Sequence, residues 1–120
     1  MSVTLLALIR RPEGGDAELE TFLQRYHAEH LPLMAMVPGL RSTHVERVTK
    51  AYGQTDLCVV TTMLFDDQES LDAAMGTQEM RAAGRSIREI APESMTLLEL
   101  ADDPMHQPEH EDLAGAGLGM

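Results

Sequence analysis

The chain has 120 residues, a formal net charge of −11 and 43% hydrophobic residues, a length and composition that predict one globular domain. The negative charge repels the phosphates of nucleic acids and the anionic headgroups of membranes, so we expect neither as a partner. No apolar stretch is long enough to span a bilayer, and Arg10 and Arg11 follow the first apolar run instead of preceding it as in a secretory signal, so we expect a soluble, cytoplasmic protein.

The first part of the chain predicts a strand followed by an amphipathic helix. Residues 3–10 are almost wholly apolar and predict the strand, and a Gly-rich turn follows them. Asp16 is a favourable N-cap residue and predicts a helix over residues 17–30. Pro32 disfavours helical angles at the residue before it, so we expect the helix to end there, with one further short helical turn beyond it.

The remainder predicts three more strands and a second helix. A polar strand over residues 40–49 is followed by a strongly apolar strand over residues 56–65. Asp66 or Asp67 caps the second helix, which is interrupted by a Gly-Thr pair and ended by a proline. The last strand covers residues 95–100.

The resulting order, β-α-β-β-α-β, is typical of the ferredoxin-like α+β fold, a four-stranded antiparallel sheet with both helices on one face. We assign residues 1–100 to this domain. Residues 101–120 contain five acidic side chains, two prolines and three glycines but no Lys or Arg, so we expect a flexible acidic tail. The alternative is an arm that reaches across a partner subunit. His106 and His110 in this tail are expected to bind metals only adventitiously.

The apolar strands predict that the protein forms a homodimer. A strand with one solvated face should alternate apolar and polar side chains, but residues 3–10 and 56–65 are apolar on both sides. In this fold these two strands form the centre of the sheet, and the polar strand lies at an edge, where polarity limits further pairing. The face without helices should therefore be buried, most simply against the same face of a second copy.

Tyr26, His27 and His30 are the candidate catalytic residues. Tyr26 and His30 share the apolar stripe of the first helix, and His27 lies one turn beyond Leu23. A neutral imidazole could accept a proton from a substrate, and the Tyr26 hydroxyl could donate a hydrogen bond to a developing oxyanion. This pair suits proton abstraction next to a carbonyl. Two structural alternatives stay open: His30 could cap the carbonyls at the end of the helix, and Tyr26 could be a packing residue.

We expect no metal and no cofactor. His27 and His30 have a spacing at which two histidines can share a metal, and His44 is a conceivable third ligand, but no acidic or thiol cluster completes the site. No glycine-rich phosphate loop indicates a nicotinamide or flavin site. The single cysteine, Cys58, lies in an apolar run and is expected to be a buried, inert thiol.

Short motifs mark the first helix, the middle strands and the start of the second helix: Phe22-x-x-x-Tyr26-His27-x-x-His30-Leu31-Pro32-Leu33, Pro38-Gly39-Leu40, Asp56 and Phe65-Asp66. In these motifs the chain resembles the EthD-like family of the dimeric α/β barrel superfamily over about residues 3–100. The resemblance implies a ferredoxin-like homodimer with a cleft between helices and sheet. Members are often labelled reductases or oxidoreductases, and the founding association is with an ether-degrading monooxygenase system. Residues 84–89 do not match the acid-bearing segment of many members, so a second catalytic acid is not expected.

Two functions follow from this interpretation. The first is a cofactor-independent enzyme, oxidoreductase- or monooxygenase-like or cyclase- or isomerase-like, acting on a small apolar carbonyl or aromatic compound in the helix–sheet cleft. The second is a non-catalytic protein that binds such a ligand, or an accessory protein of a degradation or biosynthesis pathway. A structural dimer without a ligand is a third possibility.

Overall fold

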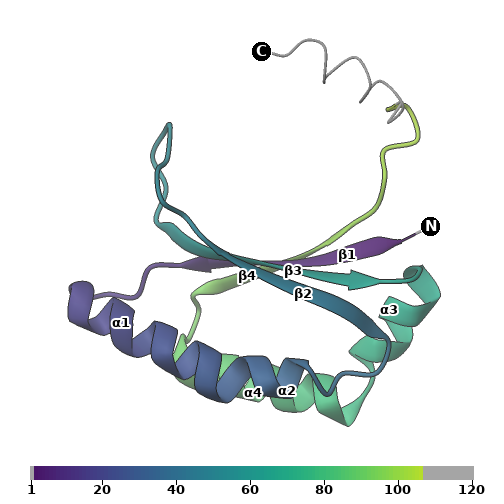
Figure 1. The fold of residues 1–120 in the computed structure, drawn as a ribbon, viewed down its shortest axis with the longest axis horizontal. Helices are drawn as coiled ribbons and strands as arrows, with labels where there is room; N and C mark the ends of the chain where they lie inside the picture. The colour runs from purple at the N-terminus through teal and green to yellow at the C-terminus, as the bar shows by residue number, and fades with distance from the viewer. Residues whose placement is uncertain (1, 107–120) are drawn as a thin grey trace.

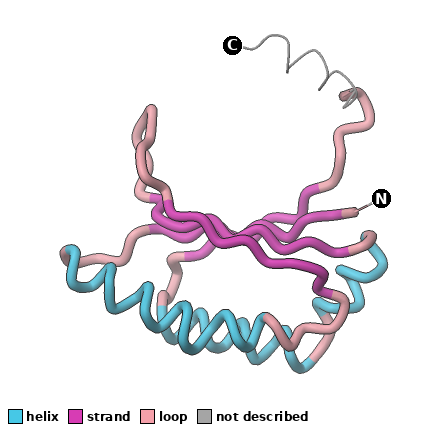
Figure 2. The backbone as a smooth tube through the Cα atoms, viewed as in Figure 1, coloured by secondary structure: helices cyan, strands magenta, loops and turns pink. Residues whose placement is uncertain are grey.

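The computed structural model describes residues 2–106, whose strands and helices follow the expected order (Figure 1). They are β1 (Val3–Arg10), α1 (Asp16–Arg25), the π-helical turn η1 (Tyr26–His30), α2 (Leu31–Met34), β2 (Leu40–Arg47), β3 (Leu57–Phe65), α3 (Gln68–Met75), α4 (Gln78–Ile90) and β4 (Met95–Leu100). The strands pair antiparallel in the order β2-β3-β1-β4. All helices lie against one face of the sheet, and no described helix covers the other (Figure 2). The ferredoxin-like α+β fold is thereby confirmed, with the two apolar strands at its centre.

The core lies between this sheet and the helices. Side chains of β1 alternate strictly, with the helix-facing row buried and the opposite row half-buried. The helix-facing side chains of the two central strands are Val3, Leu5, Ala7, Ile9, Val59, Thr61, Met63 and Phe65, all buried. Burial of each large apolar side chain contributes about 1.5–3 kcal/mol, so this layer holds the helices in place.

The sheet face without helices, here called the open face, remains apolar. Its central and β4 positions carry Leu6, Leu8, Val60, Leu64, Leu98 and Leu100. Leu98 and Leu100 are 39% and 43% exposed. An apolar row of this kind differs from the polar surface of a half-solvated antiparallel sheet.

The edge strand β2 departs from the prediction in two ways. It ends at Arg47, before the predicted end, and its register against β3 shifts between Leu40 and Ser42, which leaves Arg41 as a bulged residue. The bulge reverses the alternation of side chains along the strand. Strict alternation would place His44 on the same side of the strand as Leu40, whereas the bulge places it on the opposite side. Its exposed ring lies beside Glu46.

The helix starts are set by local hydrogen bonds. Asp16 is predicted to cap α1, but the N-cap residue is Gly15. The Gly15 N–H donates to the Glu18 carboxylate at 2.8 Å, and Asp16 instead pairs with Arg11. Asp67 caps α3 as expected, because its carboxylate accepts the Ser70 N–H at 2.8 Å.

The chain beyond β4 is described only as far as residue 106. Residues 101–106 contain a turn but neither helix nor strand. The rest of the predicted acidic tail, including His110, lies outside the described residues. None of the helices within residues 2–106 has the length and hydropathy required to cross a bilayer.

Candidate functional site

The helical segment that carries the candidate residues does not end before Pro32. It continues from α1 through η1 into α2, and Leu31 keeps helical angles with φ −60° and ψ −37°. Pro32 has no N–H, and its ring would collide with the carbonyl of residue 28 in a regular α-helix. The wider turn, in which the Leu31 N–H bonds to the Tyr26 carbonyl, accommodates the proline without ending the helix.

The same π-helical turn brings Tyr26 and His30 together. Their rings stack with centroids 5.2 Å apart and an interplanar angle of 24°, and Phe22 lies on the preceding turn with its ring 5.6 Å from that of Tyr26. Tyr26 and His30 are 1% and 5% exposed. The two predicted site residues are therefore buried side by side under the sheet.

The Tyr26 hydroxyl is held by β3. Its oxygen lies 2.6 Å from the Thr61 hydroxyl oxygen, and either group can donate this hydrogen bond. Burial raises the pKa of Tyr26, and the Thr61 hydrogen bond opposes this shift only in part. The phenol therefore stays protonated and able to donate at neutral pH.

His30 is not the helix cap that its position before Pro32 suggested. Helical backbone continues to Met34, and burial lowers the pKa of the imidazole, whereas a cap would favour the charged ring. An interaction with the Ala83 backbone opposes the shift. Nδ1 of His30 is fully buried and has no hydrogen-bond partner among the described residues. A neutral ring with one unused nitrogen can accept a proton or a hydrogen bond from a bound molecule.

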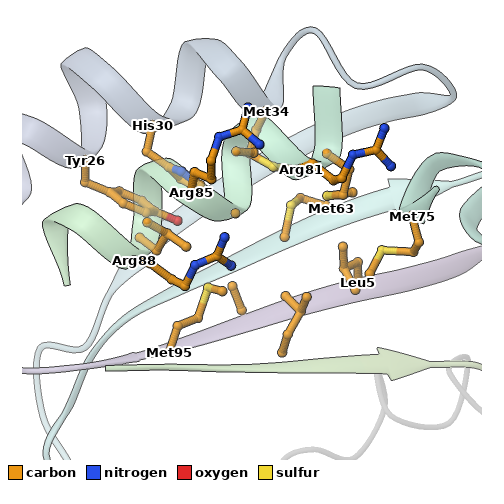
Figure 3. Close-up of a pocket in the computed structure, with 16 residues that line it drawn as sticks. Leu5, Tyr26, His30, Met34, Met63, Met75, Arg81, Arg85, Arg88 and Met95 are labelled. Carbon is orange, nitrogen blue, oxygen red and sulfur yellow. The ribbon is translucent and has the colours of Figure 1, made fainter. Parts of the chain in front are cut away.

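His30 and Tyr26 line a cavity of about 400 Å³ between the helices and the sheet (Figure 3). Most of its lining is apolar and rich in methionine: Leu5, Ala7, Met34, Met63, Met75, Met80, Ala83, Gly84, Ile87, Met95 and Leu97. Its remaining lining residues are Arg81, Arg85 and Arg88 of α4. Such a cavity fits a small, largely apolar molecule, and the flexible methionines can adapt to its shape.

The arginines are the lining residues that sequence reasoning missed. Arg81, Arg85 and Arg88 follow one another at helical spacing along one edge of the apolar stripe of α4. That spacing was visible in the sequence. Charged residues on a helix usually face solvent, however, and only the three-dimensional structure places these along a cavity that also contains His30.

The other sequence candidates lie elsewhere. His27 is exposed and does not line the cavity, because it follows Tyr26 directly and projects from a different side of the turn. Its ring meets the Tyr26 ring edge-on at 6.0 Å. His44 is on the exposed edge strand. Within residues 2–106, no three His, Cys, Asp or Glu side chains gather in a way that could hold a metal ion. Cys58 is buried as expected, and burial raises its thiol pKa.

Fold and site together define a ferredoxin-like α+β protein with an apolar cavity between its helices and its sheet. A family model described as the EthD domain matches residues 15–100, so the chain belongs to the EthD family. The resemblance seen in the sequence motifs is thereby confirmed.

Solved structures agree with this assignment. An EthD (ethyl tert-butyl ether) family protein from Bacillus halodurans C-125 is 33% identical with a TM-score of 0.76, and the match covers 86% of this chain and 100% of that one. A dimeric ferredoxin-like protein of unknown function from Bacteroides fragilis is 19% identical, with a TM-score of 0.61 over 84% and 96% of the two chains. The hydroxynitrile lyase of Passiflora edulis is 7% identical, with a TM-score of 0.64 over 88% and 97%, and shares the fold alone. No protein with a curated description matches the sequence.

Proposed function

We propose that this protein is a cofactor-independent enzyme that removes a proton next to the carbonyl of a small, largely apolar compound, with His30 as the base. The observation that carries the proposal is the buried Nδ1 of His30, which has no hydrogen-bond partner among the described residues and belongs to a side chain that lines an apolar cavity. A buried polar atom without a partner costs stability in the free protein. Because His30 lines the cavity, we infer that a substrate group bound there supplies the missing partner.

The reaction would form an enolate. His30 accepts the proton, the electron pair of the broken C–H bond forms the C=C bond of the enolate, and the π pair of the carbonyl moves onto its oxygen. The Tyr26 hydroxyl donates a hydrogen bond to that oxygen. Thr61 supports this role, because its own hydroxyl can donate to the Tyr26 oxygen and leave the phenolic proton free. Return of the proton to another carbon gives isomerisation, and attack by the enolate on a second carbonyl gives cyclisation. Neither step consumes an oxidant or reductant.

A second candidate function is ligand binding without turnover, in a carrier or accessory protein. It is favoured by the absence of any acidic side chain among the described residues that line the cavity, since many acid–base enzymes use a second proton-transfer group. The oxidoreductase label common in the family stays a hypothesis, because proton abstraction accounts for the described groups by itself.

Deuterium exchange separates these candidates. Benzylacetone, a small aryl ketone, is incubated in D₂O with the protein, and NMR follows loss of the protons next to the carbonyl. We expect His30→Gln to lower the catalysed rate about 10²–10⁴-fold, the usual contribution of a general base. His27→Gln is the matched control, because it removes an exposed imidazole from the same turn and should leave the rate unchanged. Exchange that is equally fast in His30→Gln, with melting unchanged, would refute the proposed base.

We also propose that the protein is a homodimer in which two open faces stack. Support comes from the apolar row on this face, with Leu98 and Leu100 partly exposed in the single chain. Proteins of the same fold are described as dimeric, including the one from Bacteroides fragilis. The helix-side cavity lies on the opposite face of the sheet from this contact.

A further inference from the structure

We propose that the natural ligand is a small carboxylic acid with an apolar body, and that Arg85 and Arg88 hold its carboxylate at the mouth of the cavity. This inference rests on the proposed function and narrows its substrate class. In this inference Arg85 and Arg88 recognise the charge of the ligand, whereas in the proposed function His30 removes a proton from it.

The first argument is the lack of partners for these arginines. The chain has nine Lys and Arg against twenty Asp and Glu, so carboxylates are plentiful. Arg11, Arg25, Arg41 and Arg47 each pair with a carboxylate, and Arg10 bonds to Thr96 and to the Glu93 carbonyl. Within the described residues, by contrast, Arg85 and Arg88 have no ion pair or hydrogen bond, and Arg81 donates only to the Gly76 carbonyl at 3.0 Å. The two unpaired guanidiniums are thus free to bind an anion from outside.

The second argument is their arrangement on α4. Arg81, Arg85 and Arg88 lie on one side of the helix, at spacings where like charges repel and destabilise the helix. Glu89 follows Arg85 at the spacing of a helical ion pair, yet no such pair forms. A bound anion would relieve this repulsion. In Figure 3, Arg88 extends between Tyr26 and Met95, and Arg85 and Arg81 follow along the same helix.

The third argument is the glycine in the middle of α4. A Cβ placed on Gly84 would lie 3.3 Å from Nη1 of Arg88, a tight contact. Glycine is unfavourable in the middle of a helix. Its presence here leaves room for the Arg88 guanidinium to lie back across the helix beside the cavity, which a larger side chain would obstruct.

The cavity therefore has an apolar inner part and a cationic outer part. The inner lining is apolar and takes the hydrocarbon part of a ligand, as Met63 and Leu5 illustrate. The guanidiniums at the exposed side present planar forks of N–H donors that match the two oxygens of a carboxylate. A neutral head group would form no ion pair with these exposed guanidiniums, and a cationic one would be repelled.

Three probes of one shape test this inference: phenylbutanoate, the neutral phenylbutanamide and the cationic phenylbutylamine. Their affinities are measured by calorimetry for the intact protein, for Arg85→Gln/Arg88→Gln, and for Arg41→Gln/Arg47→Gln. The last variant loses the same charge from exposed arginines of β2 that lie outside the cavity. We expect the native protein to bind the acid at least tenfold more tightly than the amide and the amine most weakly. Only the Arg85/Arg88 variant should lose the preference for the acid, with binding of the amide retained.

Equal affinity for acid and amide in the native protein would overturn the carboxylate assignment while leaving the apolar cavity and His30 as proposed. The same holds if the preference survives in the Arg85→Gln/Arg88→Gln variant. Failure of all three probes to bind would overturn both proposals. An Arg85→Lys/Arg88→Lys variant keeps the charge and should retain part of the preference, which separates loss of recognition from damage to α4. His30→Gln should lose exchange activity. If this variant still prefers the acid, the result would support separate roles for the arginines in carboxylate binding and for His30 in proton abstraction.

Discussion

The imidazole of His30 makes a specific contribution to the pH dependence of stability. Burial lowers its pKa in the folded protein below the ordinary value of 6.5, so the unfolded chain binds more protons between the two values. Stability is therefore complete above about pH 6.5 and decreases as the pH falls toward the folded-state pKa, by about 1.4 kcal/mol per pKa unit of displacement.

Urea unfolding at about pH 7.5 and about pH 5.5 measures the contribution of His30 to the free energy of unfolding. These values lie about one unit on either side of the ordinary histidine pKa. We expect His30→Gln to lose less stability than the native protein between the two conditions. His27→Gln keeps the buried ring and should lose as much as the native protein. An identical loss in all three proteins would show that His30 is not desolvated as described.

Tyr26 and His30 could be selected from the sequence, because an apolar helical stripe predicts which side chains are buried. The contact between their two rings could not be predicted in this way. The stacking of the two rings depends on the π-helical turn, and the orphaned Nδ1 depends on packing against α4, neither of which leaves a local sequence signal. Helical spacing also makes His27 a candidate, but its ring is exposed and does not line the cavity.

At the scale of elements, the order of strands and helices follows directly from hydrophobic periodicity and turn residues. The departures occur where one residue alters the local geometry. A π-helical turn accommodates Pro32, so the helix does not end there. A bulge at Arg41 reverses which side of the sheet the later β2 side chains face. The bulge depends on the pairing of β2 with β3, which a single sequence does not encode locally.

The turn from α2 into β2 depends on Gly39. Its φ of +86° lies in the region that favours glycine, although a Cβ there would meet only ordinary contacts, the nearest at 3.8 Å from Phe65. Gly39→Ala should therefore destabilise the protein through backbone strain, by about 1–2 kcal/mol. Gly53→Ala is the control, because an added Cβ there meets nothing within 4 Å and Gly53 lacks a positive φ. Thermal unfolding of the two variants provides the comparison, and equal melting temperatures would contradict the strain argument.

At the scale of the whole molecule, Leu97 and Leu98 provide a matched pair for the proposed dimer. They are adjacent on β4 and similarly exposed, 38% and 39%, but Leu97 lines the cavity and Leu98 lies on the open face. We expect Leu98→Arg to convert the dimer into monomers, because a charge would be buried between the stacked sheets. Leu97→Arg should remain dimeric. Sedimentation analysis measures the oligomeric state of the three proteins. A native protein that sediments as a monomer at micromolar concentration would contradict the proposed dimer.

The central claim is that a neutral His30 abstracts a proton inside the cavity, and the pH profile of deuterium exchange in benzylacetone tests it most directly. Because only the neutral ring can act as base, the rate should be constant above neutrality and fall below about pH 6.5, with its midpoint on the acidic side of the ordinary histidine pKa. His30→Gln should abolish this profile and His27→Gln should reproduce it. A catalysed rate that rises as the pH falls, or that keeps the same profile without His30, would contradict the claim.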